Sequence, residues 1–346
     1  MFKYLIVLSI FISKLSFASI CAISSSFHLM HSSKDSAVLL KDSYLLAEGN
    51  IKNKFDHIFI DDGNDASFVG LVKKAISANC KVTVGAFTSK ECLLAGPYLE
   101  KSGMYLISPS CGHDKIQTFY PKIHTIVPKI EMYADSIAKE SKKHEKPIII
   151  QQKSDVYSSH FTSLLRKRIK DARIVNITKD GEIIDGEKHL SQSRLIIFTT
   201  YPLPSFAFML NLNKMKLDKR NISVFASASW AYDLKVIKKQ SSSLKKFKSV
   251  LITDFWDPTS RGHKFFADYK KSFNRRAENL AALSYDLSTA ILACKESLRA
   301  KPSEVDIRRC IDNNKSRPVA GDFKLEKNSS FARRELRTYS LLERLN

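Results

Sequence analysis

One stretch of the chain, residues 81–114, constrains the fold more than any other. Its sequence, KVTVGAFTSKECLLAGPYLEKSGMYLISPSCGHD, begins with a short β-branched run and continues as turn, helix, strand and turn. Thr88 and Glu91 have the spacing of a capping box that opens the helix, and Gly103 ends it. A second apolar run then leads into the polar turn 109–113. This order predicts a βαβ unit whose turns both lie at the carboxyl ends of neighbouring parallel strands.

Strand and helix patterns alternate through the rest of the chain as well. The first hundred residues contain at least three alternations, and a second series follows an extended, proline-marked stretch at residues 120–128. Alternation of this kind indicates a doubly wound parallel sheet. Two more extended stretches, at residues 254–258 and 318–321, interrupt the pattern again. Two similar α/β series with three extended crossings predict two lobes joined by several hinge strands.

The N-terminus has the features of an export signal. Lys3 supplies a positive start, residues 5–12 are apolar, and residues 16–18 (Ser-Phe-Ala) form a small-x-small pattern. An apolar segment this short cannot span a bilayer, so residues 1–18 are predicted to be a signal peptide cleaved after Ala18. The remainder of the 346-residue chain is too long for one small core and suits two domains of an exported protein.

All six cysteines follow this signal segment. An even number in an oxidising compartment predicts disulfides, although six cysteines allow 15 pairings. The strand–helix model brings together Cys294 and Cys310, Cys92 and Cys111, and Cys21 and Cys80. The sequence by itself leaves the pairing open. No two cysteines have CxxC spacing and the histidines are far from them in sequence, which argues against redox catalysis and against a metal site.

The basic residues exceed the acidic ones by 21, a balance that raises the question of nucleic-acid binding. These residues are scattered, with local runs at residues 142–146, 166–173 and 238–248. No run alternates with aromatic residues in a recognised nucleic-acid module. Solvated helix faces and loops are therefore expected, and no nucleic-acid partner. Attraction to an anionic envelope surface or to an acidic partner stays open.

Several segments, taken in order, resemble the type I periplasmic binding proteins, specifically the branched-chain amino-acid, amide and urea binding proteins of ABC transporters. VGAFTSKECLLAGPYLEKSGMYLISPS resembles the family's strand–turn–helix–strand unit, and IDDGND its second-strand end. KFFADYKKSF and ALSYDLSTAILACKESL resemble its aromatic helix and its Ala-x-x-Tyr-Asp helix. The resemblance covers essentially the whole mature chain. It implies an α/β fold of two doubly wound parallel-sheet lobes joined by a three-stranded hinge, with lobe 1 at residues 19–122 and 255–317 and lobe 2 at residues 125–251 and 322–346.

The resemblance also implies a ligand site between the lobes. Ser89 would hold a carboxylate of the ligand, together with groups of the next strand-end turn at Ser110 and Gly112. Tyr157 from lobe 2 would cover the ligand, and Tyr201 at the following strand end would add a contact. Physical reasoning agrees with these implied roles. All of these positions follow strand ends, where open sheets bind ligands, and the start of a helix presents free amides to an anion.

Some positions depart from the family's pattern. Gly112 stands where the family usually offers a hydroxyl, and residues 226–230 contain no acid to receive a ligand's ammonium group, the nearest being Asp233. An ammonium closed into a dry cleft without a counter-charge is costly, so a simple branched-chain amino acid is not the expected ligand. Trp230 and Trp256 are candidates for an aromatic wall of the cleft, with simple packing as the alternative.

The expected function is that of a monomeric solute-binding protein. It would capture a small polar ligand, amino-acid- or amide-like, and present it to the membrane permease of an ABC transporter. The alternative is an exported regulatory or scaffolding module of the same fold that binds a protein or cell-wall partner. An enzyme is not expected, because the sequence has no Gly-x-Ser-x-Gly, His-Glu-x-x-His or phosphate-loop motif. Asp61 and Asp62 beside His57 are better explained by strand-end capping, and no cofactor or metal is expected.

Overall fold

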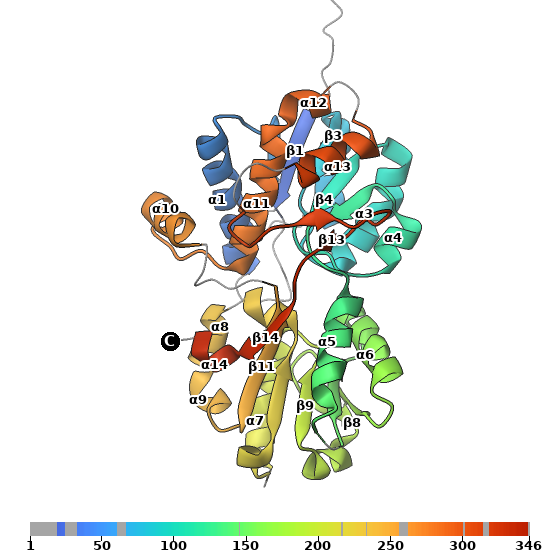
Figure 1. The fold of residues 1–346 in the computed structure, drawn as a ribbon, viewed down its shortest axis with the longest axis vertical. Coiled ribbons are helices and arrows are strands. Elements are labelled where there is room, and N and C mark those ends of the chain that lie inside the picture. Colours follow the sequence, from blue (N-terminus) through green and yellow to red (C-terminus); the bar gives the residue numbers. More distant parts are fainter. Residues whose placement is uncertain are drawn as a thin grey trace, which may run out of the picture.

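The computed structural model describes residues 19–24, 33–60, 67–144, 146–215, 217–232, 234–255, 262–299, 302–313 and 318–344. The predicted signal peptide, residues 1–18, lies outside this part of the chain, as do Asp61, Asp62, Asp233 and Trp256. The described residues form two lobes stacked end to end, each built on its own sheet (Figure 1). Within these ranges, no helix has both the length and the apolar character needed to cross a membrane.

Lobe 1 is built on a five-stranded sheet of order β2-β1-β3-β4-β5 in which every neighbouring pair is parallel. Its strands are β1 (Ser19–Ser24), β2 (His57–Ile60), β3 (Cys80–Val84), β4 (Tyr105–Ser108) and β5 (Ile123–Thr125). Ile20 and Ala22 pack into one apolar cluster, whereas Cys21 and Ile23 pack into another. Both faces of the sheet are therefore buried, which explains why its strands are apolar without polar alternation.

Helices cover both faces of this sheet. The first cluster contains residues of α1 (Ser33–Ile51), α10 (His263–Phe273), α11 (Asn279–Ala293), α12 (Lys295–Arg299) and α13 (Glu304–Asp312). The opposite cluster contains residues of α2 (Phe68–Ser77), α3 (Ser89–Ser102) and α4 (Lys115–Phe119). The C-terminal part of the chain thus returns to complete the lobe that the N-terminal part begins (Figure 1).

Lobe 2 is built on a seven-stranded sheet of order β14-β11-β10-β9-β6-β7-β8. Its strands are β6 (Ile148–Gln152), β7 (Arg173–Ile177), β8 (Ile183–Asp185), β9 (Leu195–Phe198), β10 (Ser223–Ala226), β11 (Ser249–Asp254) and β14 (Arg337–Ser340). The edge strands β8 and β14 are antiparallel to their neighbours. The five parallel strands between them have the same winding order as lobe 1, so the predicted fold of two doubly wound lobes is confirmed.

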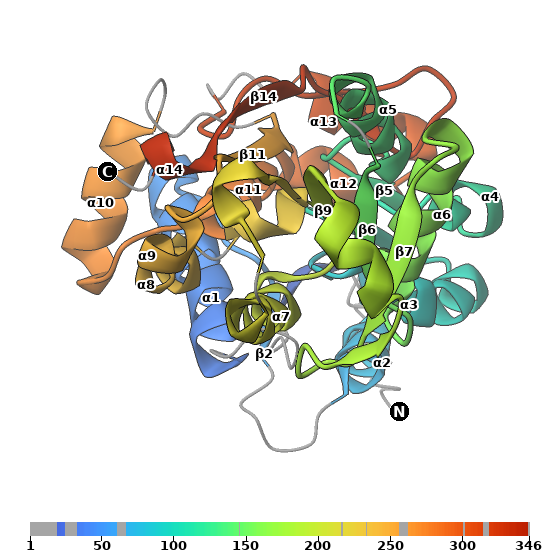
Figure 2. The same cartoon turned by 90° about the horizontal axis from the view of Figure 1, so that it is seen from below.

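The helices of lobe 2 also lie on two faces, as Figure 2 shows from below. One face is covered by α5 (Ile130–Ser141) and α6 (Val156–Arg168). The other is covered by α7 (Pro202–Lys214), α8 (Leu234–Lys239), α9 (Ser241–Leu244) and α14 (Leu341–Arg344). Three short 3-10 helices complete the described part of the lobe: η1 (Glu187–Gln192), η2 (Lys219–Asn221) and η3 (Ala228–Tyr232).

The last crossing between the lobes lies later than predicted. The predicted lobe 2 segment begins at residue 322, but residues 322–333 include β12 (Lys324–Leu325) and β13 (Ala332–Arg333), which pack on lobe 1. The Asp286 carboxylate of α11 accepts hydrogen bonds from the amides of Val319 and Ala320, both at 2.7 Å. These bonds hold the turn at residues 318–321 on lobe 1, so the chain crosses only between β13 and β14.

All six cysteines are paired, and all three disulfides lie in lobe 1. The pairs are Cys21–Cys80, Cys92–Cys111 and Cys294–Cys310, the same pairs that the strand–helix model brings together. They join β1 to β3, α3 to the turn after β4, and the end of α11 to α13. The turn after β4 is therefore covalently tied to the first turn of α3, and the start of β3 is tied to β1.

Helix α3 depends on a glycine where it packs against the chain that follows α4. A Cβ on Gly96 would lie 2.4 Å from Cγ and Cδ1 of Tyr120, atoms at the base of the ring that cannot simply swing away. Replacing Gly96 by alanine should therefore destabilise the protein. Overpacking of this kind costs about 1–3 kcal/mol, which outweighs a gain in helix propensity of about 1 kcal/mol at most. Urea unfolding of Gly96→Ala measures the difference.

Gly49 in α1 provides the matched control. A Cβ at this exposed position would meet no described heavy atom within 4 Å. Gly49→Ala should therefore leave the protein as stable as before or more stable, by up to about 1 kcal/mol. Equal effects of the two substitutions would show that the contact between Gly96 and Tyr120 has no energetic weight.

Candidate ligand-binding site

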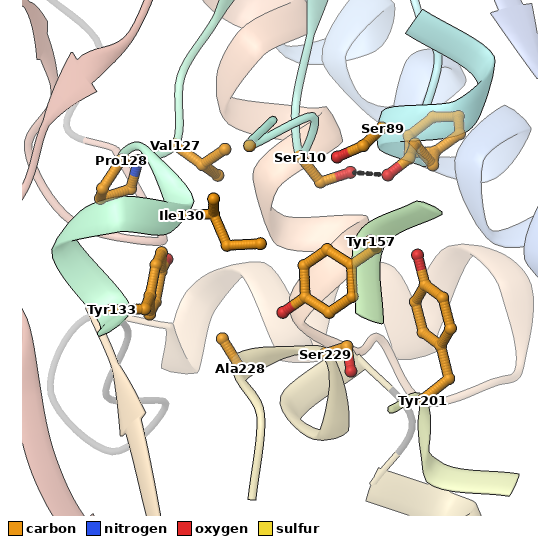
Figure 3. Close-up of a pocket in the computed structure, with 12 residues that line it drawn as sticks. Ser89, Ser110, Val127, Pro128, Ile130, Tyr133, Tyr157, Tyr201, Ala228 and Ser229 are labelled. Carbon is orange, nitrogen blue, oxygen red and sulfur yellow. Dashed lines mark hydrogen bonds between the residues drawn. The ribbon is translucent and has the colours of Figure 1, made fainter. Parts of the chain in front are cut away.

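A cavity lies between the two lobes, where the carboxyl ends of both sheets face each other (Figure 3). The empty space inside it is about 480 Å³, counted to where it opens into solvent. The residues that line it come from both lobes: Phe87, Ser89, Ser110, Gly112, Val127, Pro128, Ile130, Tyr133, Tyr157, Tyr201, Ala228 and Ser229. Open α/β sheets bind ligands at this edge, next to the strand where the winding order reverses.

Ser89 reaches the cavity because a capping box starts α3 there. The Thr88 hydroxyl accepts a hydrogen bond from the Glu91 amide at 3.1 Å, and the Glu91 carboxylate accepts one from the Thr88 amide at 2.9 Å. Ser89 follows as the first helical residue and is only 3% exposed. Its hydroxyl has no hydrogen-bond partner among the described residues and points towards Ser110 (Figure 3). A buried hydroxyl at a helix start is suited to meet an anion.

Ser110 and Gly112 lie in the turn that follows β4. The Ser108 hydroxyl shapes this turn by accepting hydrogen bonds from the Ser110 amide at 3.1 Å and the Cys111 amide at 2.9 Å. The Ser110 hydroxyl donates to the Phe87 carbonyl at 2.7 Å, so its proton already has a partner in this conformation. The Gly112 carbonyl accepts a hydrogen bond at 3.0 Å from the amide at the start of α5. Gly112 thus ties the lobe 1 side of the cavity to lobe 2.

Two tyrosines form the lobe 2 wall. Asp155 caps α6 by accepting a hydrogen bond from the Ser158 amide at 2.7 Å, which positions Tyr157 in the first turn. The rings of Tyr157 and Tyr201 lie 5.4 Å apart between centroids and are tilted by 30°. Burial raises the pKa of Tyr157, with a hydrogen bond to Ser227 acting in the opposite direction. The phenol therefore stays neutral at physiological pH and presents a ring face together with a hydroxyl.

Five of the six predicted ligand contacts line this one cavity: Ser89, Ser110, Gly112, Tyr157 and Tyr201. The sixth, Trp230, does not, and its assignment as a cleft wall is wrong. Trp230 is fully buried in the lobe 2 core, with its ring 4.8 Å from that of Phe206, and its indole N–H donates to the Thr200 carbonyl at 3.3 Å. The short 3-10 helix after β10 turns the indole into the core and leaves Ala228 and Ser229 at the cavity.

The first crossing and α5 contribute cavity residues that were not expected from the sequence. Val127 and Pro128 lie in that crossing, and Ile130 and Tyr133 lie in the first two turns of α5. Their position in the sequence gave one indication, because a helix that starts immediately after a crossing places its first turns beside the cleft. Their apolar pattern gave none, since it is the same as that of a helix that faces the core.

A histidine pair joins the lobes at one side of the cleft. The rings of His113, from the turn after β4, and His160, from α6, stack with centroids 3.9 Å apart and planes within 13°. His160 also bonds through Nε2 to the Asp114 carboxylate at 3.0 Å. Burial, together with the neighbouring His160, lowers the pKa of His113 to about 4. His113 is therefore neutral at pH 7, which allows the two rings to stack.

In the described part of the chain, no three His, Cys, Asp or Glu side chains come together in a way that could hold a metal ion. The cavity instead combines hydroxyls, backbone groups and aromatic rings. Such a surface can recognise a small molecule with one polar end.

No family model matches the sequence, and no curated protein sequence matches it. Solved structures do resemble the fold. The leucine binding protein LivK from Thermotoga maritima has a TM-score of 0.77 at 13% identity, over 93% of this chain and 95% of its own. LivJ from Streptococcus pneumoniae, in complex with isoleucine, has a TM-score of 0.76 at 14% identity, over 93% and 95%. A solute binding protein from R. palustris, in complex with benzoate, has a TM-score of 0.72 at 11% identity, over 94% and 93%.

These likenesses cover nearly the whole of each chain, and they establish the fold. The protein has the two-lobe architecture of the type I periplasmic binding proteins, as its sequence resemblance implies.

Proposed function

We propose that this protein is an exported solute-binding protein that captures a small polar ligand between its lobes for the permease of an ABC transporter. One observation carries the proposal. One cavity between the two sheets is lined by five residues that were expected to contact a ligand. These residues come from four strand-end turns. The proteins of similar fold bind leucine, isoleucine or benzoate, each of which carries a carboxylate. The predicted signal peptide and the three disulfides support a periplasmic location.

Binding and delivery would follow from one equilibrium between open and closed lobes. Ligand held by Ser89 on lobe 1 and covered by Tyr157 on lobe 2 contacts both lobes only when they are closed. Its affinity is then higher for the closed state, and this difference is what shifts the population towards closure. A permease that recognises the closed form would receive loaded protein.

The test is a thermal-shift screen of the purified mature chain with amino acids, amides, urea, short peptides and aromatic acids. A true ligand should raise the melting temperature, and the rise should disappear in the double variant Ser89→Ala, Tyr157→Ala. The matched double variant Ser272→Ala, Tyr98→Ala removes the same two residue types outside the cavity and should keep the full shift. A shift that survives in the first double variant would place the ligand elsewhere.

A second function, as an exported regulatory or scaffolding module, is favoured by the net charge of +21. Such a charge attracts acidic partners at low ionic strength. No stabilising metabolite in the screen, together with co-purification of a partner that is lost at high salt, would select this function over transport.

A further inference from the structure

We infer that the ligand is a monocarboxylate with an apolar, ring-sized body and no ammonium group. This inference rests on the proposed function and adds the chemical class of the ligand. It follows from how the polar and apolar groups are distributed over the cavity, and from what the acidic side chains near it already do.

The polar groups suited to an anion gather at one end of the cavity. Ser89 is 3% exposed, has no hydrogen-bond partner among the described residues, and lines the cavity at the first turn of α3. The first amides of a helix lack partners within the helix, and its dipole favours negative charge there. A buried hydroxyl without a partner beside that helix start provides a site for one carboxylate.

The remaining walls are apolar or aromatic except at Ser229, whose hydroxyl is hydrogen-bonded to that of Ser227. Tyr157 and Tyr201 form one wall, and Figure 3 shows Ile130 and Tyr133 on the other side of Tyr157. Aromatic rings whose centroids lie about 4.5–7 Å apart attract each other beyond the effect of the area they bury. A planar or branched apolar body fits this surface better than a polar amide does.

A counter-charge for an ammonium is what the cavity lacks. None of the described residues that line it is acidic. Acidic residues near the cavity are bonded to other groups. Asp254, whose charge acts on Tyr157, accepts hydrogen bonds from the Phe255 amide at 2.8 Å and from the Asn279 side-chain amide at 3.2 Å. Glu91 accepts hydrogen bonds from the Phe87 and Thr88 amides at 2.8 and 2.9 Å, Asp155 caps α6, and Asp114 bonds to His160 at 3.0 Å.

The absence of an acidic side chain makes the cavity discriminate between ligands with and without an ammonium group. An α-amino acid closed into the cavity would lose the hydration of its ammonium and gain no opposite charge in return. The corresponding acid without the amino group loses nothing of this kind and keeps every carboxylate and apolar contact. Two molecules that differ only by that group should therefore differ strongly in affinity.

The experiment measures two matched pairs by isothermal titration on the full mature chain: 3-phenylpropionate against L-phenylalanine, and 4-methylpentanoate against L-leucine, with benzoate as a fifth probe. At least one acid without an amino group should bind at least about tenfold more tightly than its amino-acid partner. Equal or tighter binding of the amino acids would overturn the ligand class and leave the solute-binding function standing. Absence of binding by all five, with no ligand in the wider screen, would overturn the proposed function and this inference with it.

A variant that adds an acidic side chain to the cavity tests whether the missing carboxylate sets the preference between ligands. Ala228 lines the cavity on lobe 2, and its side chain points into it (Figure 3). Ala228→Asp supplies the missing carboxylate and should shift the preference within a pair towards the amino acid by at least about tenfold. Ala228→Asn has nearly the same shape without the charge and should not. An equal shift in both variants would mean that polarity, and not charge, sets the preference.

Discussion

Replacing Arg334 by methionine is expected to lower the free energy of unfolding by about 3–5 kcal/mol, because a buried charge-assisted network loses its centre. Arg334 is 4% exposed and lies at the last crossing between the lobes. Its Nε donates to the Ile126 carbonyl at 2.6 Å, in the first crossing. Its guanidinium lies 4.4 Å from the ring centroid of Phe255, which follows β11 at the second crossing. One side chain therefore holds all three hinge segments together.

The same guanidinium also fixes the turn that keeps the C-terminal strands on lobe 1. It donates to the carbonyls of Ala320 and Gly321 at 2.9 and 3.0 Å. Burial raises the pKa of the nearby Asp286 to about 7, and the positive charge of Arg334 acts in the opposite direction. Methionine would leave three buried carbonyls without this donor and Asp286 without this charge.

The measurement is urea unfolding followed by circular dichroism and by fluorescence. Arg334→Met should also separate a single transition into two, because without this side chain the three crossings couple the lobes less strongly and each lobe can unfold by itself. Arg333→Met is the matched control, since the neighbouring arginine is exposed and should change stability by no more than about 0.5 kcal/mol. A loss of less than about 1 kcal/mol in Arg334→Met would contradict the assigned role.

The order of strands and helices could be predicted because it depends on local patterns. The β-branched runs, the Thr88 capping box and the apolar stripe of residues 279–298 each identify an element without reference to the rest of the chain. Alternation then limits the topology to parallel, doubly wound sheets. The structure divides the segment at residues 279–299 into α11 and α12 at Cys294, and the apolar pattern gives no sign of the division because it continues on both sides.

Five cavity residues were expected because the family resemblance implies them, and topology agrees. Ser89, Ser110, Gly112, Tyr157 and Tyr201 all follow strand carboxyl ends, which lie at one edge of each sheet. The direction of a side chain within a turn could not be predicted in this way. At Trp230 the chain enters a 3-10 helix, and one residue of rotation decides whether an indole faces the cleft or the core.

The polar and ring contacts at the hinge and at the edge of the cleft could not be predicted. Nothing in the local sequence distinguishes Arg334 from the many other basic residues of the chain. Its contacts form only when the folded chain brings the three crossings side by side. The stacking of His113 on His160 depends on how close the lobes come, which no local pattern encodes. Long-range polar contacts thus define the hinge and the edges of the cleft, while local patterns define the scaffold.

Acidification from pH 6.5 to pH 4 is expected to remove about 3 kcal/mol of stability through His124 alone. His124 lies in β5, is fully buried, and stacks on Tyr105 with ring centroids 6.2 Å apart. Neither ring nitrogen has a hydrogen-bond partner among the described residues. Burial lowers the pKa of His124 to about 4; Glu304 of α13 acts to raise it, and Arg308 of the same helix lowers it further.

The sign follows from the two pKa values of His124. In the unfolded chain the imidazole takes up its proton near pH 6.5, whereas in the folded protein it does so only near pH 4. The unfolded state therefore binds more protons between these values, and stability is complete above pH 6.5 and falls as the pH drops towards 4. In His124→Leu, the loss of stability between pH 7 and pH 4 should be smaller than in the native chain by about 3 kcal/mol. His263→Leu removes an exposed histidine and should leave the pH profile unchanged, whereas identical profiles for His124→Leu and the native chain would mean that His124 can be protonated without opening the lobe 1 core.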